Sequence, residues 1–195
     1  MMKDYSAYKV GVLALQGAVS EHLAQIQSLG ATAVTIKTVA QLDELDALVL
    51  PGGESTSIGK LMRTYGFIEA IQAFAKQNKP IFGTCAGMIL LAKTLEGGEQ
   101  AHLQLMDIAV QRNAFGRQVD SFQTDLAVKG LAKPFPAVFI RAPYISQILD
   151  KSAVEILAEF DGNVVLAKQG NLLACAFHPE LTSDNQVMSL FLGMI

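Results

Sequence analysis

The chain has 195 residues, of which 51% are hydrophobic and 17% charged, and its formal net charge is −3. This composition supplies enough apolar residues for a single compact domain spanning residues 1–195, and it disfavours disorder. The charges are nearly balanced and form no Lys/Arg cluster, which argues against nucleic-acid binding. We therefore expect a globular protein that recognises neither DNA nor RNA.

The sequence also argues against a membrane protein and against a metal site. No stretch reaches the ~20 consecutive apolar residues that a membrane-spanning helix needs. The first apolar run ends at Gln16 without a cleavage site, so we interpret it as a buried strand. Cys85, Cys175 and the three histidines show no metal-binding spacing. We expect a cytoplasmic protein without metal or cofactor, in which a free thiol can serve as a reagent.

The first half alternates short apolar runs with helical patterns. The predicted strands are 9–15, 32–37, 47–50 and 80–82, and the predicted helices are 18–30, 56–77 and 88–95. The second of these helices is expected to break near Gly66, and Gly30 lies where a helix often ends. Strands that alternate with helices indicate parallel pairing, and continuous apolar strands indicate a sheet covered on both faces.

The second half has a different pattern, in which strands are joined by tight turns. The strand-like segments are 106–113, 117–130, 137–143, 155–170 and 171–179. Asp161-Gly162 is a strong hairpin signal. An amphipathic helix is expected over 185–195. Together the two halves predict a three-layer α/β sandwich around a mixed, mainly parallel sheet.

The segment Gly83-Thr84-Cys85-Ala86-Gly87 carries the clearest chemical signal. It lies between a predicted strand and a predicted helix, and G-x-C-x-G in that setting is the thiol form of a nucleophile elbow. A helix N-terminus favours a thiolate and presents free backbone N–H groups to a developing oxyanion. Cys85 is thus the candidate nucleophile, whereas Cys175 alternates within an apolar run as core cysteines do.

A catalytic thiol needs a base, and the chain offers three histidines. We expect His22, on a helix, and His102, in a polar connection, to be solvated. His178 directly follows an apolar strand, and catalytic groups of open α/β sheets gather beyond such strand ends. Glu180, two residues on, can turn back to orient the imidazole. We therefore predict a Cys85–His178–Glu180 triad.

The glycine-containing loop 51–57 follows a predicted strand and leads into a helix. It could cradle a phosphate through its backbone, although it does not match the Walker pattern. Alternatively, the Gly53 N–H could act as an oxyanion donor for a carbonyl bound at Cys85. Ser55 or Thr56 would cap the helix in either case.

Taken together, these motifs resemble the class I (triad) glutamine amidotransferases, which have a flavodoxin-like fold. Within that superfamily the chain is similar to the glutaminase subunits of pyridoxal 5′-phosphate synthase, the source of vitamin B6. The similarity covers nearly the whole chain and is carried by GVLALQGAVSEH, LPGGEST, FGTCAGMILLAK, RNAFGRQVDSF, VFIRAP and AFHPEL. One departure is Ala114, where relatives often carry a hydroxyl residue.

The resemblance implies that Cys85 attacks the glutamine amide to form a thioester, while His178 transfers protons and Glu180 orients it. It further implies an oxyanion hole at Gly53 and Ala86. The implied glutamine-binding residues are Gly53, Glu54, Ser55, Arg112, Ile140 and Arg141. Gln16 matches a position near the active site of this family, which implies a role in activation.

The resemblance also implies a partner, since released ammonia becomes unreactive ammonium in water. That partner is the (β/α)₈-barrel synthase subunit, which forms a large hetero-oligomer with the glutaminase. Two alternatives remain at this stage. One is another cysteine hydrolase on a similar sheet, such as a peptidase or deglycase, and the other is a binding subunit without turnover.

Overall fold

The computed structural model describes residues 3–113, 115 and 120–195. Its strands are β1 Lys9–Leu13, β2 Thr32–Ile36, β3 Ala47–Leu50, β4 Ile81–Thr84, β5 Ala92–Leu95, β6 Met106–Gln111, β7 Ser121–Leu126, β8 Phe135–Ile140, β9 Tyr144–Ile148, β10 Glu155–Phe160, β11 Asn163–Gln169 and β12 Leu172–Cys175. Its helices are α1 Ser20–Ser28, α2 Ser55–Thr64, α3 Phe67–Lys76, α4 Ala86–Leu91 and α5 Gln186–Leu192, with short 3₁₀ turns η1 Val39–Glu44, η2 Glu96–Gly98 and η3 Pro179–Leu181.

Within the described residues, ten strands form one mixed sheet in the order β2-β1-β3-β4-β12-β11-β9-β6-β5, with β10 beside β11. The strands β2, β1, β3, β4 and β12 are parallel neighbours, which we call the parallel region. Its central strands β3, β4 and β12 are buried at every position. A strand covered on both faces must be apolar throughout, which explains the short continuous apolar runs in the sequence.

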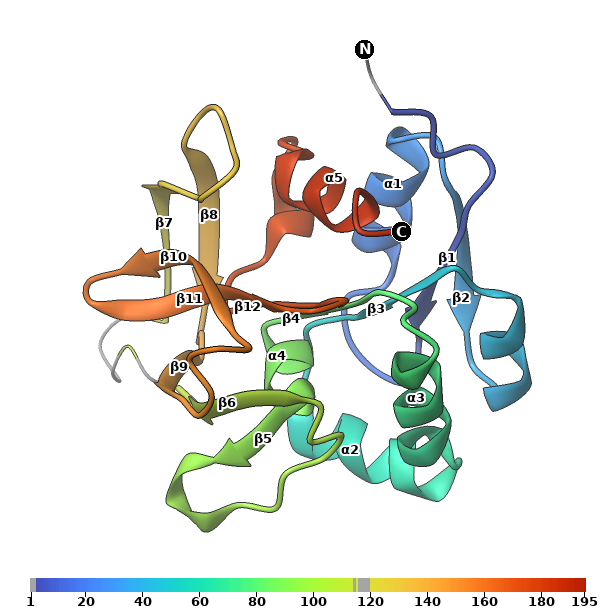
Figure 1. Ribbon diagram of the computed structural model, residues 1–195, viewed down its shortest axis with the longest axis horizontal. Coiled ribbons are helices and arrows are strands. Elements are labelled where there is room, and N and C mark those ends of the chain that lie inside the picture. Colours follow the sequence, from blue (N-terminus) through green and yellow to red (C-terminus); the bar gives the residue numbers. More distant parts are fainter. Residues whose placement is uncertain (1–2, 114, 116–119) are drawn as a thin grey trace.

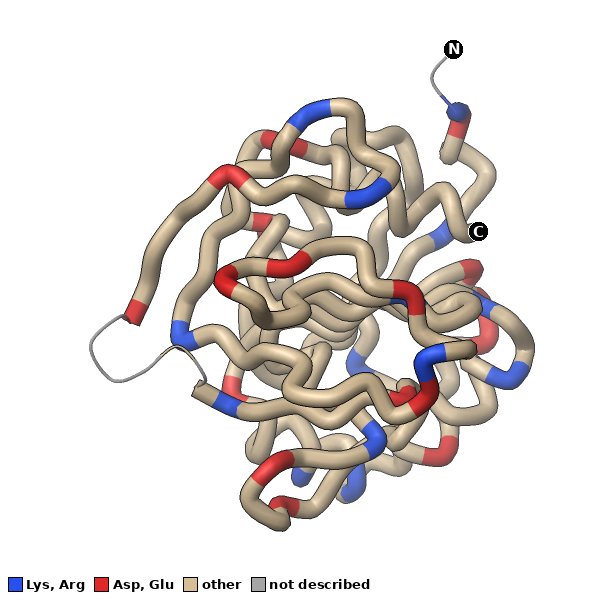
Figure 2. The backbone as a smooth tube through the Cα atoms, turned by 60° about the vertical axis from the view of Figure 1, so that its left-hand side comes forward, with Lys and Arg blue, Asp and Glu red and all other residues tan. Residues whose placement is uncertain are grey.

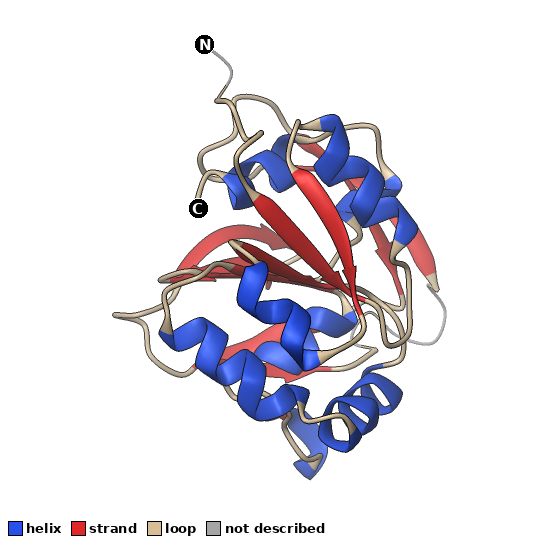
Figure 3. Ribbon diagram, turned by 90° about the vertical axis from the view of Figure 1, so that its right-hand side faces the viewer, coloured by secondary structure: helices blue, strands red, loops and turns tan. Residues whose placement is uncertain are grey.

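Helices cover both faces of this sheet, as Figure 1 shows and the orthogonal view in Figure 3 confirms. The helices α1 and α5 lie on one face, and α2, α3 and α4 lie on the other. Phe82 of β4 and Phe191 of α5 pack with ring centroids 5.2 Å apart, so the core continues from the sheet into the helical layer. The predicted three-layer α/β architecture with a mixed sheet is confirmed.

The strands β6, β9, β10 and β11 pair antiparallel, and we call them, together with the separate β7–β8 pair, the antiparallel region. Asp161 and Gly162 connect β10 to β11 with φ of 51° and 79°, as the predicted hairpin turn requires. Phe122 of β7 stacks on Phe139 of β8, with ring centroids 4.7 Å apart. Phe139 also packs on Phe177, which follows β12, with ring centroids 5.6 Å apart, so the β7–β8 pair shares the core of the main sheet.

One predicted element differs in the structure, and one strand of the structure was not predicted. The helix expected over 88–95 ends at Leu91, and Ala92–Leu95 instead form β5, which pairs with β6. A short apolar run fits either a buried helix or a buried strand. Here residues 92–95 form a strand because β6 lies beside them as a pairing partner. The strand β9 was not predicted as a separate element. By contrast, the predicted break near Gly66 is confirmed, since Gly66 has φ of 77° between α2 and α3.

In the view of Figure 2, acidic and basic residues are interspersed along the described part of the chain. Among the helices of the described residues, none combines the length and apolar character needed to cross a membrane.

Candidate active site

The elbow at Cys85 joins β4 to α4. Cys85 has φ of 52° and ψ of −105°, a conformation that non-glycine residues adopt only when their surroundings enforce it. Its N–H donates to the Cys175 carbonyl at 2.8 Å, which ties the turn to the neighbouring strand β12. The thiol is 8% exposed and sits at the head of α4, where the backbone N–H groups lack helical partners.

Glycine is required on both sides of this cysteine because the backbone packs too closely for a side chain. A Cβ on Gly83 would lie 2.4 Å from the Gly87 carbonyl oxygen, and one on Gly87 would lie 2.1 Å from the Leu50 carbonyl oxygen. Both obstacles are backbone atoms that cannot rotate away. The G-x-C-x-G spacing therefore follows from the tight strand-to-helix turn.

His178 and Glu180 lie just beyond the carboxyl end of β12, which pairs in parallel with β4. The His178 N–H donates to the Val138 carbonyl of β8 at 2.8 Å, which fixes the backbone. In the side chains, His178 Nδ1 lies 2.6 Å from Glu180 Oε1. The Glu180 side chain is fully buried and that of His178 is 11% exposed.

Gly52 brings the thiol and the imidazole to one place. A Cβ on Gly52 would lie 2.6 Å from His178 Cε1 and 3.6 Å from Cys85 Cβ, so this glycine packs against both residues. The structure thus gathers the three predicted triad residues at one edge of the sheet, from β4, β12 and the turn that follows β12. Their catalytic roles remain predictions.

The electrostatics of the site favour a charged histidine and a charged glutamate. Burial lowers the pKa of His178, but the nearby Cys85 thiol and Glu180 carboxylate outweigh it and raise that pKa to about 10. Burial raises the pKa of Glu180, yet the hydrogen bond from His178 and the nearby His22 bring it below its ordinary value. Burial also raises the pKa of Cys175 well above its ordinary value, so this thiol stays protonated and unreactive.

A cavity of about 560 Å³ opens beside the thiol. All the predicted substrate-binding and oxyanion residues line it together with the triad. The predicted residues in its lining are Gly53, Glu54, Ser55, Cys85, Ala86, Arg112, Ile140, Arg141, His178 and Glu180. Such a volume suits a small polar molecule, and the ring of polar groups would orient it.

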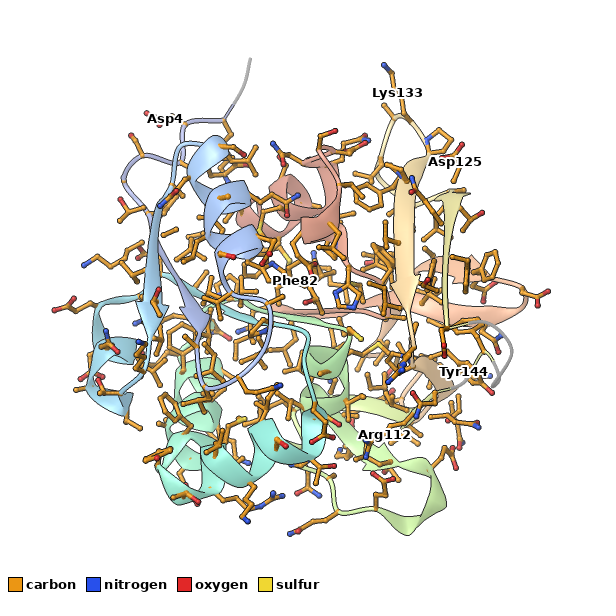
Figure 4. All side chains as sticks on the ribbon, turned by 180° about the vertical axis from the view of Figure 1, so that it is seen from behind. Asp4, Phe82, Arg112, Asp125, Lys133 and Tyr144 are labelled. Carbon is orange, nitrogen blue, oxygen red and sulfur yellow. The ribbon has the colours of Figure 1, made fainter. Side chains whose placement is uncertain are left out.

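The two arginines differ in how they are held. Arg112 donates to Glu99 Oε2 at 2.7 Å and to Glu54 Oε1 at 3.3 Å, and its side chain is 30% exposed. Arg141 is 73% exposed, with Nε 3.9 Å from Asp120 Oδ1. In Figure 4, Arg112 lies away from the packed centre that Phe82 marks. Arg112 is thus held by two carboxylates, whereas Arg141 is the more exposed of the two arginines.

Gln16 contacts the glycine loop. Its Oε1 accepts a hydrogen bond from the Glu54 N–H at 2.9 Å, and a Cβ on Gly53 would come within 2.4 Å of the same oxygen. The Gln16 side chain therefore fixes the backbone directly after Gly53, a predicted oxyanion donor. Its role in activation remains a prediction.

The expectation that His22 and His102 are solvated is wrong. His22 is fully buried, and its Nε2 lies 3.1 Å from Thr84 Oγ1. His102 is half-buried, and its ring covers Gly59 of α2. The signal for His22 was present in the sequence, since it lies three residues after Val19 and four before Ile26, on the apolar side of the helix.

Two other parts of the site were not anticipated or lie outside the structure. Glu99, which pairs with Arg112, was not predicted, because it lies in a polar connection without a distinctive motif. Ala114 and residues 116–119 of the segment RNAFGRQVDSF lie outside the described residues. Across the residues that are described, no cluster of three or more His, Cys, Asp or Glu side chains could hold a metal ion.

A thiol at a strand-to-helix elbow, facing a His–Glu pair from a parallel neighbour strand, is the arrangement of a cysteine nucleophile on an α/β sheet. The chain belongs to the SNO glutamine amidotransferase family, whose model matches residues 12–195. The predicted resemblance to glutamine amidotransferases is therefore confirmed.

Relatives and solved structures agree with this membership. The chain is 70% identical over 193 residues to the pyridoxal 5′-phosphate synthase subunit PdxT of Pasteurella multocida (strain Pm70), covering 99% of this chain and 100% of the relative. It is 66% identical to the subunit of the same name from Actinobacillus pleuropneumoniae serotype 3 (strain JL03), covering 100% and 99%. A crystal structure of a glutamine amidotransferase superposes with a TM-score of 0.90 at 46% identity, covering 95% of this chain and 97% of that one.

Proposed function

We propose that residues 1–195 act as one glutamine amidotransferase domain that hydrolyses L-glutamine to L-glutamate and ammonia through a thioester on Cys85. We further propose that the ammonia passes to a synthase subunit that makes pyridoxal 5′-phosphate. The observation that carries the proposal is the packing of Cys85 and His178 around Gly52, with Glu180 2.6 Å from the imidazole.

In the first half of the reaction, the Cys85 thiolate adds to the side-chain amide carbon of glutamine. The resulting oxyanion is stabilised by the backbone N–H groups of Ala86, at the start of α4, and of Gly53. His178 is protonated at neutral pH because its pKa is raised to about 10. It therefore donates a proton to the departing nitrogen, so that ammonia leaves and the γ-glutamyl thioester remains.

In the second half, the now neutral His178 accepts a proton from a water molecule, and the hydroxide attacks the thioester carbon. The carbon–sulfur bond breaks, glutamate leaves and the thiolate returns. Glu180 remains ionised throughout, and its hydrogen bond to Nδ1 keeps Nε2 of His178 available for proton transfer.

Recognition of free glutamine would fall to groups at the rim of the cavity. Arg112 and Arg141 can bind the substrate's α-carboxylate, since a guanidinium pairs with a carboxylate through two hydrogen bonds. Glu54 already accepts hydrogen bonds from the N–H groups of Thr56 and Ser57, which hold it in place. Its charge can then attract the α-ammonium group.

The partner follows from the relatives and from the chemistry of ammonia. Relatives that match this chain end to end are named as subunits of pyridoxal 5′-phosphate synthase. We propose that the partner is its (β/α)₈-barrel subunit, which receives the ammonia before water protonates it. We also propose a cytoplasmic location, because Cys85 must remain a free thiol.

The catalytic proposal is tested by labelling with an electrophilic glutamine analogue, followed by mass spectrometry and a glutamate-release assay. We expect the adduct on Cys85 and not on the fully buried Cys175. Replacement Cys85→Ala should reduce glutamate release by about 10³-fold or more, as loss of a nucleophile does. Labelling of Cys175, or full turnover by Cys85→Ala, would overturn the proposal.

The partner is tested by mixing the chain with the barrel subunit. Co-elution in size-exclusion chromatography and a rise in glutaminase turnover are expected. Failure of both would refute the partner while leaving the glutaminase reaction intact.

A further inference from the structure

A second buried histidine lies next to Glu180 of the triad and outside the lining of the cavity. His22 projects from α1 and is fully buried. Its Nε2 lies 3.1 Å from Thr84 Oγ1 and 3.6 Å from Glu180 Oε2. The first distance is that of a hydrogen bond, and the second is an electrostatic contact without a direct hydrogen bond. The reaction described above assigns no part to His22 or to Thr84.

Glu180 therefore lies between two imidazoles. Its Oε1 contacts His178, whereas its Oε2 faces His22 and has no hydrogen-bond partner within the described residues. A fully buried carboxylate is unfavourable unless nearby dipoles or charges compensate it. His22 is the group placed to compensate the second oxygen.

The tautomer of His22 follows from these contacts. Burial lowers the pKa of His22, so the ring is neutral at pH 7 and carries one proton. A proton on Nδ1 would leave a buried donor unused, because this atom has no partner in the part of the chain that the structure describes. It would also turn the Nε2 lone pair toward the Glu180 carboxylate. A proton on Nε2 faces both Thr84 and Glu180, so this tautomer is favoured.

We propose that His22 is a positioning residue for the reaction: its Nε2–H links the strand that ends at Thr84 to the Glu180 carboxylate, and so holds that carboxylate ionised and aimed at His178. The proposal rests on the proposed function of the same site. Since Thr84 immediately precedes Cys85, His22 joins the nucleophile side of the site to the Glu180 side from within the core.

A purely structural role predicts different behaviour. If His22 only filled space, an apolar side chain of similar size would replace it without affecting the reaction. If its N–H supports Glu180, an apolar replacement should lower kcat and leave KM unchanged, because His22 lies outside the cavity lining. The acidic limb of the pH–kcat profile should also move to higher pH, since Glu180 would take up a proton more readily.

Several groups contribute to that pH profile. Glu180 is faced by His178, by His22 of α1 and by the thiol of Cys175 on β12. His22 is influenced in addition by Glu21 on its own helix. Replacement of His22 alters one of these groups and leaves the others in place.

The first test needs no substitution at His22. The chain has three histidines, so a long-range ¹H–¹⁵N spectrum of the imidazoles is simple, and a His102→Gln spectrum together with pH titration assigns them. We expect His22 to be neutral with its proton on Nε2 at pH 7.5. A proton on Nδ1, or on both nitrogens, would overturn the proposal. This result does not depend on turnover, so it is independent of the proposed function.

The second test compares His22→Leu with His22→Gln, which keeps a side-chain N–H donor. In glutamate release with the barrel subunit present, His22→Leu should lose about tenfold in kcat, or about 1.4 kcal/mol of transition-state stabilisation, with KM within about twofold. His22→Gln should recover most of that loss. The control His102→Gln should keep the wild-type acidic limb.

The outcomes separate the two proposals. Wild-type protein without glutaminase activity would refute the proposed function. Active wild-type protein together with a folded His22→Leu variant of unchanged kcat and pH profile would refute the role of His22. Equal losses in the leucine and glutamine variants would refute it too, since the N–H would then not matter. If His22→Leu does not fold, the tautomer of His22 in the NMR spectrum of the wild-type protein decides whether the proposal stands.

Discussion

The parallel and antiparallel regions contribute different parts of the site. The parallel region supplies Cys85, His178 and Glu180 at the ends of β4 and β12, and these side chains are almost completely buried. The segments that follow β6 and β8, in the antiparallel region, supply Arg112 and Arg141, which are 30% and 73% exposed. The groups with the strictest geometry thus come from the most buried strands.

The difference has a physical reason. Proton transfer and nucleophilic attack require distances fixed to fractions of an ångström, which a densely packed core can hold. Binding a small zwitterion from water instead requires charged groups that a ligand can reach. The two regions meet at β8, where the Ile140 carbonyl lies 3.9 Å from the Cys85 thiol. Three predictions examine this division of labour, in order of decreasing effect.

The largest effect is expected in the parallel region at Gly87→Ala. The added Cβ would lie 2.1 Å from the Leu50 carbonyl oxygen, so the elbow must shift. We expect a loss of about 3 kcal/mol in the free energy of unfolding in urea, as for an overpacked core, and a large loss of glutaminase activity. Gly193→Ala, whose nearest neighbours would be 3.3 Å away, is the matched control. Wild-type stability in Gly87→Ala would contradict the packing argument.

An intermediate effect is expected at the rim. Arg112→Ala should raise KM for glutamine about tenfold or more with little change in kcat, because it removes the charged hydrogen-bond partner that we propose for the substrate. Arg112→Lys should recover only part of the lost affinity for glutamine, since an ammonium group cannot form the two parallel hydrogen bonds that a guanidinium forms with a carboxylate. Arg141→Ala should have a smaller effect, because that side chain is more exposed. If Arg112→Ala lowered kcat and left KM unchanged, the assignment of substrate binding to the rim would be wrong.

The smallest effect is expected on stability at acid pH, at Glu54. This residue follows a strand of the parallel region but is exposed, so it tests whether burial, and not position in the sheet, determines the size of an effect. Hydrogen bonds from Ser57 and Thr56 lower its pKa from 4.5 to about 2. The unfolded chain therefore takes up this proton first, and stability is lost as the pH falls from 4.5 toward 2. Glu54→Gln should reduce that loss by less than about 1 kcal/mol, since the side chain is 48% exposed. Urea unfolding at pH 3 and pH 6 measures this loss of stability. If Glu54→Gln lost as much stability between these pH values as the wild type, the prediction would be wrong.

Local signals predicted much of the fold. The burial of β3, β4 and β12, the break at Gly66 and the turn at Asp161-Gly162 follow from residue types within a few positions of one another. The strand β5 could not be separated from the preceding helix, because MILLAKTL is short and largely apolar and only pairing with β6 determines its state. The elbow and the His178-Pro179-Glu180 segment were visible for the same local reason.

The sequence by itself determined which reactive groups the protein contains: a thiol between glycines that permit a sharp turn, and an imidazole two residues from a carboxylate. Only the tertiary structure decided which groups meet. It buried His22 against Thr84 and Glu180, and it paired Arg112 with Glu99. Such contacts join residues up to 158 positions apart, as between His22 and Glu180. They depend on how helices pack on the sheet, in the case of His22, and on how loops meet at its edge, in the case of Arg112, and no short stretch of residues encodes either property.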